Sequence, residues 1–416
     1  MGLSTIIIFS FVISLDVISA FPQATNESAP VPVAPVTAEK VVADGILSLS
    51  VDLIRNLHHA VKGENLIFSP LSIYAALSLT YLGAGGNTHD EIGKVLRSPT
   101  GSNEIEKFHK SLGSLLESIQ SRPERVLAEV TIANGFFLKQ QLELKPTYLN
   151  KSKEIYKSEI QKLDFTKQDE AVAVINKWVS EKTQGRIPQL FQDPLDPDTL
   201  AILASSLYFN GRWNEHFYES KTKNETFFTG VEEITTPLMH NEDAIPYVNN
   251  SSLQFEAIAL EYDGKDFSMG IILPYANQSL SNLTENLKPE HIKQVFDEEN
   301  CISIDYKIPR MKFQSSFSLK DSLSALGIQS AFHAANFSNL IEAVPMKISD
   351  VKHAAEIVVD EDGTTASAIT AIQLIPLSGK VVIDPLKFYV NRPFLLAIYH
   401  RPTSTLLFLA AVHKPL

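Results

Sequence analysis

The chain is almost without cysteine, because its 416 residues include only Cys301. An intramolecular disulfide is therefore impossible, and folds built on a disulfide framework and zinc sites built on several cysteines are excluded. A lone cysteine can crosslink two chains or react with other thiols. More often it is a small buried apolar residue, and we expect this of Cys301.

Long apolar runs and runs of basic residues are also scarce. The formal net charge is −12, and no Lys/Arg cluster suggests a nucleic-acid or heparin-type surface. The N-terminus contains a short apolar stretch, Thr5–Ser14, followed by Val17–Ala20. A membrane anchor is the alternative interpretation, but the stretch is too short and Asp16 interrupts it. It is typical of a secretory signal, so we expect residues 1–20 to be removed and the protein to be secreted and extracellular.

Residues 21–37 and several sequons agree with export. The segment 21–37 is rich in Pro, Ala, Val and Thr, which predicts a flexible leader before a single domain over residues 38–416. Asn-x-Ser/Thr sequons, the candidates for glycosylation, occur at Asn26, Asn150, Asn224, Asn249, Asn250, Asn277, Asn282 and Asn336. Glycans on the adjacent Asn249 and Asn250 would collide, so we do not expect both to be occupied.

Proline, charge and bulky aromatics are all absent between Gly363 and Ile375, within the segment Glu361–Ser378. Every backbone N–H there is free to join a strand ladder, and no side chain prevents burial. An ordinary exposed loop does not need this composition. The pattern predicts a loop that can become a central strand.

Periodicity predicts an α+β fold, with helices concentrated in the first third and strands afterwards. Helices are expected over about 38–59, over 70–82 with Ser69 as N-cap and Pro70 as first residue, over 171–181 and over 317–326. Strands are expected over 131–138, 201–209, 267–273 and 303–308, and within 388–412.

Catalytic signatures are missing from the chain. It contains no G-x-S-x-G, no H-E-x-x-H and no phosphate-binding loop. Its His, Asp and Glu residues are not arranged at metal-ligand spacing. We therefore expect neither an enzyme nor a metal or cofactor site.

Four stretches together resemble the serpin family. The first is Asn65–Ile73, read Asn-Leu-Ile-Phe-Ser-Pro-Leu-Ser-Ile, with Leu82-Gly83 and Thr88–Ile92 after it. The second is Asn176-Lys-Trp-Val179 with Thr183-Gln-Gly-Arg-Ile187. The third is Tyr208-Phe-Asn-Gly-Arg-Trp213, and the fourth is Phe388-Tyr-Val-Asn-Arg-Pro-Phe394. They occur in the family's order across about residues 38–416.

The resemblance implies a serpin fold of about nine helices and three β-sheets, with an exposed reactive-centre loop over about residues 361–384. It implies an inhibitor of serine-type endopeptidases rather than an enzyme. Such a protein is cleaved by its target, holds it as a covalent acyl-enzyme and inserts the loop into the main sheet. The expected partner is a serine protease, with no nucleic acid and no membrane, and the inhibitor is expected to be a monomer before reaction.

The resemblance also assigns parts of the loop. The hinge is expected at Glu361, Asp362, Gly363, Thr364, Thr365, Ala366, Ser367 and Ala368. Counting the family's usual fourteen residues beyond Gly363 places the bait bond at Leu377–Ser378, which suits a chymotrypsin- or elastase-like protease. Because the chain after Leu377 is slightly longer than in many relatives, Lys380–Val381 is an alternative for a trypsin-like protease. A non-inhibitory carrier or storage serpin is a further alternative, although such proteins often have proline or charge in the hinge.

The resemblance to serpins also assigns the remaining site residues, by their matching positions in the sequence. His353 matches a histidine beside the insertion gap, Ser69 and Ser72 match hydroxyls beneath it, and Trp213 matches a tryptophan near its top. We expect these buried polar groups to be hydrogen-bonded to one another. Four positions depart from the family pattern: Ser205 replaces a common Asn, Asp362 a common Glu or basic residue, Ile369 a small residue, and Ala410 a common Gly.

Overall fold

The fold is that of a computed structural model, which describes residues 37–61, 63–120, 128–196, 199–297, 301–342, 347–364 and 384–415. The expected signal peptide, the leader through Val36 with its sequon at Asn26, and the loop from Thr365 to Ile383 lie outside these residues. Contacts group Thr37–Leu416 into one compact unit. None of the described helices combines the length and the apolarity needed to cross a bilayer.

The described residues contain nine α-helices and fifteen strands, which confirms the α+β prediction. The helices are α1 Ala38–Val61, α2 Pro70–Gly83, α3 Gly86–Val95, α4 Ser102–Ile119, α5 Pro146–Tyr156, α6 Gln168–Lys182, α7 Leu280–Asn286, α8 Pro289–Val295 and α9 Lys320–Ala325. The strands are β1 Leu66–Phe68, β2 Ala128–Lys139, β3 Glu159–Leu163, β4 Ala201–Arg212, β5 Lys223–Phe228, β6 Glu233–Asn250, β7 Phe255–Glu261, β8 Phe267–Pro274, β9 Cys301–Pro309, β10 Met311–Ser318, β11 Asp350–Val359, β12 Gly363–Thr364, β13 Leu386–Tyr389, β14 Phe394–His400 and β15 Thr405–Val412.

Helix α2 begins as the sequence predicts. Pro70 is its first residue, and the side chain of Ser69 caps it by accepting a hydrogen bond from the Ser72 N–H. The helix predicted over 317–326 begins later, at Lys320, because Phe317 and Ser318 still pair with β11 as the end of β10.

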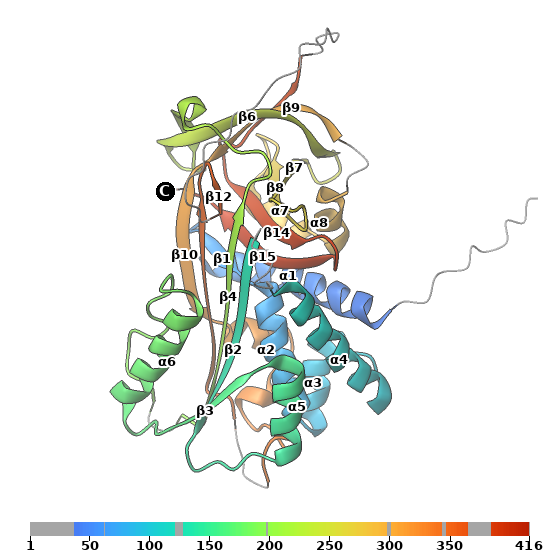
Figure 1. Ribbon diagram of the computed structural model, residues 1–416, viewed down its shortest axis with the longest axis vertical. Coiled ribbons are helices and arrows are strands. Elements are labelled where there is room, and N and C mark those ends of the chain that lie inside the picture. The colour runs from blue at the N-terminus through green and yellow to red at the C-terminus, as the bar shows by residue number, and fades with distance from the viewer. Residues whose placement is uncertain are drawn as a thin grey trace, which may run out of the picture. The chain divides into compact units, whose positions relative to one another are not determined.

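Six strands form one sheet in the order β10-β11-β12-β4-β2-β3. Helices α2 and α6 cover its opposite faces, and Figure 1 shows α6 on one side of the upright strands and α2 to α5 on the other. Alternate residues of each strand face the two helices, as the pleat requires. On β2, for example, Ile132 and Phe136 pack in the larger core with α2, whereas Ala133 and Phe137 pack with α6.

The remaining strands make up the other two expected sheets, one with β1, β15, β14, β8 and β7 and one with β5, β9 and β13, and these two are continuous as one nine-stranded sheet. Strand β6 is the reason, since it runs unbroken from Glu233 to Asn250. Its first part pairs with β5, most of its length pairs with β9, and its last residues pair with β7. Two sheets that were expected to be separate are therefore joined through one long strand.

Cys301 is exposed, so the prediction that it is buried is wrong. It is the first residue of β9, and the first three residues of that strand are exposed before burial begins at Ile304.

The asparagines of the sequons after Asn26 lie at or near the surface. Asn250 is half-buried, and the rest are exposed: Asn150, Asn224, Asn249, Asn277, Asn282 and Asn336.

Candidate functional site

The hinge enters the six-stranded sheet as the short strand β12. Gly363 and Thr364 lie between β11 and β4, where Thr364 is opposite Val359 on one side and Gly211 on the other. The Thr364 side chain is only 3% exposed, and its hydroxyl is 2.7 Å from the hydroxyl of Tyr262. The chain therefore leaves the described region at Thr364 with that residue already seated as a central strand.

Gly363 is required by close packing at this entry. Its φ is +155°, and a Cβ atom there would lie 2.2 Å from the carbonyl oxygen of Gly211. Any side chain would have to displace the main chain of β4, so the position accepts only glycine. The next residue, Thr364, is the first whose side chain must fit inside the sheet.

Trp213 holds the turn that leads into β12. Its indole N–H donates to the carbonyl of Asp360 at 2.9 Å, and its main-chain N–H donates to the carbonyl of Asp362 at 3.0 Å. The indole stacks on the ring of Tyr262 with 4.7 Å between centroids. Trp213 and Tyr262 therefore fix both the backbone and the first inserted side chain of the hinge.

Glu361 is the acceptor of an ionic contact that we call the clamp, formed by Glu361, Arg310 and Thr222. The Arg310 Nε lies 2.8 and 2.7 Å from the two carboxylate oxygens, and the Thr222 hydroxyl donates to one of them at 2.5 Å. Burial of Glu361 alone would raise its pKa, but the hydrogen bonds from Arg310 and Thr222 outweigh it and hold the pKa below its ordinary value. The clamp fastens the hinge to the junction between β9 and β10 and to the residue before β5.

Strands β4 and β11 are held apart by β12 at Thr364, and below it they pair directly with each other only after a gap. Their ladder is parallel and runs from Ile202 opposite Asp350 to Ser206 opposite Ala354. The space above this ladder is lined by residues of both strands and covered by the segment after α6: Thr183, Arg186, Ile187, Leu207, Tyr208, Phe209, Glu356 and Val358. An inserting strand would pass first through this space and then through the five-residue ladder.

The predicted polar groups meet in the ladder, in a row that we call the shutter. Asn134 of β2 is opposite Ser205 of β4, which is opposite His353 of β11. His353 is fully buried and its Nε2 accepts a hydrogen bond from the main-chain N–H of Ser69 at 3.0 Å. Burial lowers the pKa of His353 to about 3, against a smaller opposing effect of the Ser205 backbone. The imidazole is therefore neutral at physiological pH.

The expected mutual hydrogen bonding of the shutter side chains needs correction. The Ser69 hydroxyl caps α2 and the Ser72 hydroxyl donates to the Ser69 carbonyl, so neither hydroxyl bonds to His353. Within the described part of the chain, three buried oxygens here have no hydrogen-bond partner: Oγ of Ser205, Oγ of Ser206 and Oδ1 of Asn134. With Ser205 where the family commonly has Asn, the hydrogen-bonding capacity of the shutter is thus only partly satisfied.

Several site residues were not predicted. Arg310 and Thr222 of the clamp, and Tyr262 behind Thr364, come from segments far from the hinge in sequence. No local pattern marks them. Thr365, Ala366, Ser367, Ala368, Leu377, Ser378, Lys380 and Ile369 lie outside the described residues.

A family comparison identifies the architecture around this hinge. The family described as Serpin (serine protease inhibitor) matches residues 44–415. The chain belongs to the serpin family. Serpins are mostly protease inhibitors rather than enzymes.

Individual relatives cover nearly the whole domain. The chain is 31% identical to a serine protease inhibitor of the rat, Rattus norvegicus, over 85% of its own length and 84% of the relative. It is 29% identical to the pig leukocyte elastase inhibitor over 88% of its own length and 97% of the relative. A solved structure of human thyroxine-binding globulin with its hormone superposes with a TM-score of 0.82 at 25% identity, covering 91% of this chain and 100% of that one.

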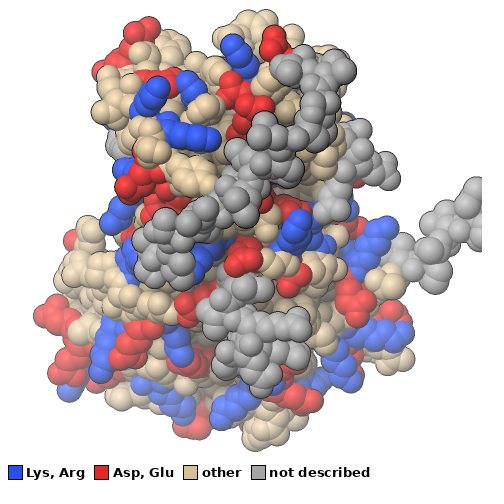
Figure 2. Space-filling view, turned by 45° about the horizontal axis from the view of Figure 1, so that its top comes forward, with Lys and Arg blue, Asp and Glu red and all other residues tan. Residues whose placement is uncertain are grey.

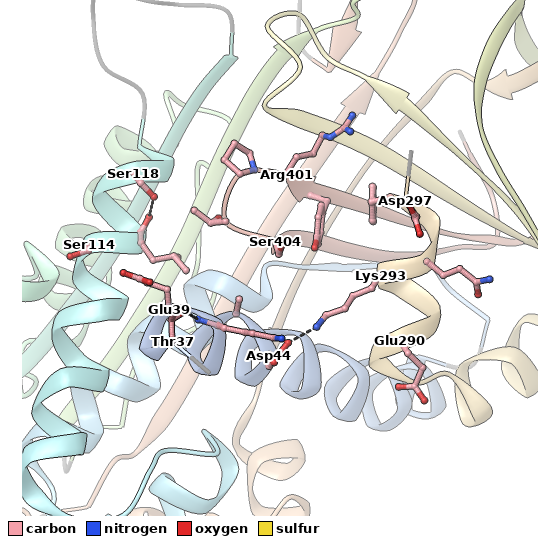
Figure 3. Close-up of a pocket in the computed structure, with 18 residues that line it drawn as sticks. Thr37, Glu39, Asp44, Ser114, Ser118, Glu290, Lys293, Asp297, Arg401 and Ser404 are labelled. Carbon is pink, nitrogen blue, oxygen red and sulfur yellow. Dashed lines mark hydrogen bonds and ion pairs between the residues drawn. The ribbon is translucent and has the colours of Figure 1, made fainter. Parts of the chain in front are cut away.

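The surface of this serpin has two further features. Figure 2 shows Lys and Arg interspersed with Asp and Glu over the face brought forward there, in keeping with the acidic composition. A groove of about 1230 Å³ lies between the start of α1, the end of α4, α8 and the turn from β14 to β15. Figure 3 shows Lys293 reaching across it to Asp44, with Arg401 and Ser404 on the opposite wall.

Proposed function

We propose that this serpin is secreted and inhibits a serine protease by trapping it. The observation that carries the proposal is the seating of Thr364 between β4 and β11, because the hinge has already begun the strand that insertion would extend. The absence of proline and charge from Gly363 to Ile375 supports continued insertion. Two relatives named as protease inhibitors support the same function.

The proposed bait bond is Leu377–Ser378. The protease serine attacks the Leu377 carbonyl, the peptide bond to Ser378 breaks, and the acyl-enzyme forms while the loop inserts. The fourteen residues from Thr364 to Leu377 would span roughly 46 Å as a strand, which is long enough to carry the bound protease along the sheet. Leucine at this position favours a chymotrypsin- or elastase-like target; the Lys380–Val381 bond would favour a trypsin-like one.

A protease panel tests both the trapping and the bond. We expect an SDS-stable complex with a chymotrypsin- or elastase-like enzyme, and a released C-terminal peptide that begins at Ser378. A peptide that begins at Val381 would move the bait to Lys380. Cleaved serpin together with fully active protease from every class would contradict trapping.

A carrier function is the second candidate, supported by the groove in Figure 3 and by the fold shared with thyroxine-binding globulin. Apolar residues Leu115, Phe296 and Tyr399 line the groove together with Lys293 and Arg401. Titration with thyroxine, followed by equilibrium dialysis, tests this function. Saturable binding together with absent trapping would favour the carrier.

A further inference from the structure

Two histidines form a partly buried, hydrogen-bonded pair at the opposite end of α1 from the groove. The rings of His58, near the end of α1, and His413, just after β15, are nearly parallel, with centroids 5.1 Å apart and planes inclined by 11°. Their Nε2 atoms are 2.9 Å apart. His58 is 4% exposed, and His413 is half-buried.

The neighbours of the pair fix which ring nitrogens carry hydrogen. The Thr284 hydroxyl of α7 donates to the Ser281 carbonyl at 2.8 Å, so its oxygen accepts from Nδ1–H of His58 at 3.2 Å. Nε2 of His58 then has a lone pair and accepts the hydrogen bond from Nε2–H of His413. The contact between the rings therefore requires His58 to be neutral.

The pair joins three elements that meet at the C-terminus. His58 belongs to α1, Thr284 belongs to α7, and His413 continues β15. Asn65 holds the same C-terminal segment through its side-chain oxygen, which accepts from the main-chain N–H groups of His413 at 2.7 Å and Lys414 at 2.9 Å. Strand β15 pairs with β1, and Ser69 of the shutter follows β1 directly.

We propose that His58 and His413 form an acid-sensitive latch that fastens the C-terminal end of β15 to α1 and α7. Nδ1 of His413 can take a first proton without breaking the contact between the rings. A second proton removes the lone pair of His58 and places two cations at a separation of 2.9 Å. Acid therefore releases the latch and loosens the support of β1 behind the shutter.

Charged and titratable groups surround the pair. His59 of α1 lies next to His58 and contacts Glu285 of α7 at 3.5 Å, and Lys414, next to His413, lies 4.0 Å from Glu232. Arg55 of α1 and Glu64 after it lie on the same segment of the chain. Burial, then His59, lowers the pKa of His58, and Glu285 opposes them. Burial, then His58, lowers the pKa of His413 to about 4. Because both values lie below the ordinary 6.5, the unfolded chain binds more protons, and stability is lost as the pH falls from about 6.5 to about 4.

Unfolding of matched variants tests the latch, whether or not the serpin traps a protease. When the pH is lowered from 7 to 5, proton uptake by His413 on unfolding should by itself increase the equilibrium constant for unfolding roughly 20-fold. The double variant His58→Ala with His413→Val should lose this part of the pH dependence. His59→Gln, a change at the exposed neighbour, should keep the wild-type slope. An unchanged slope in the double variant would overturn the proposal.

Hydrogen exchange in the unmodified protein gives a test that does not depend on how the variant folds. At pH 5, after correction for the intrinsic exchange rate, protection should fall in β15, the end of α1 and α7 but not in the remote α6. A loss spread equally over these elements and the remote α6, or no loss at all, would contradict the latch.

Discussion

The top and the middle of the six-stranded sheet are held by different chemistry. At the top, the Glu361 carboxylate is paired with Arg310 and Thr222, and Trp213 binds two carbonyls of the hinge turn. In the middle, the shutter has one imidazole bond to a main-chain N–H, and buried oxygens of Ser205, Ser206 and Asn134 have no partner among the described residues. Charge-assisted bonds are the stronger kind, and orphaned buried oxygens reduce stability.

This difference separates two tasks of the proposed inhibitor. A firmly held hinge fixes where the loop enters the sheet. A weakly satisfied shutter lowers the free energy needed to part β4 from β11, because few side-chain bonds are lost when the ladder opens. The comparison predicts that changes at the top alter where and whether insertion begins, whereas changes in the middle alter how readily the sheet opens.

The largest expected effect is that of Thr364→Arg on trapping. Thr364 is buried with its hydroxyl against that of Tyr262, so an arginine would have to bury a charge inside the sheet. The trapped fraction should fall at least about tenfold while cleavage continues, measured as SDS-stable complex against cleaved serpin. Thr364→Ser, which keeps the hydroxyl, is the control and should trap normally. Equal trapping by the arginine variant would remove the argument from insertion.

Glu361→Gln should weaken the top of the sheet. The substitution removes the charge that Arg310 binds, and we expect the free energy of unfolding to fall by about 1–3 kcal/mol. Denaturant unfolding measures the change. Glu219→Gln is the matched control, because Glu219 is 86% exposed and lies 3.9 Å from Arg310. If the two variants lose the same stability, the clamp is not what holds the hinge.

Lowering the pH should destabilise the shutter, in the middle of the sheet, before it destabilises the clamp at the top. The pKa of His353 is lowered to about 3, so its contribution to stability is lost progressively as the pH falls from about 6.5 to 3. The pKa of Glu361 lies below its ordinary 4.5, so the clamp is lost only at pH values below 4.5. Hydrogen exchange at pH 5.5 should therefore show lower protection around the shutter but not at β12. His353→Gln should remove this dependence; a loss that begins at β12 would reverse the order.

The smallest effects distinguish the shutter hydroxyls. Ser205→Ala removes an oxygen without a described partner, so stability should be unchanged or should rise by up to about 1 kcal/mol. Ser72→Ala removes a hydroxyl that donates to Ser69 at 3.2 Å, and stability should fall by about 1 kcal/mol. Thermal or denaturant unfolding of the two variants provides the comparison. Equal losses would mean that the Ser205 hydroxyl has a partner.

The hinge was predictable because its constraints are local. Gly363, the uncharged stretch after it, and the cap at Ser69 and Pro70 can each be recognised from neighbouring residues. The clamp was not predictable, because Arg310 and Thr222 meet Glu361 only through the packing of distant segments. For the same reason the sequence did not indicate that Ser69 reaches His353 through its main chain, or that β6 joins two sheets.

Heat stability before and after cleavage at Leu377–Ser378 tests most directly whether the loop is a strand waiting to insert. Insertion adds a central strand between β4 and β11 and fills the space below Thr364. The cleaved protein should therefore unfold at a clearly higher temperature than the intact protein. An equal or lower unfolding temperature after cleavage would contradict the account.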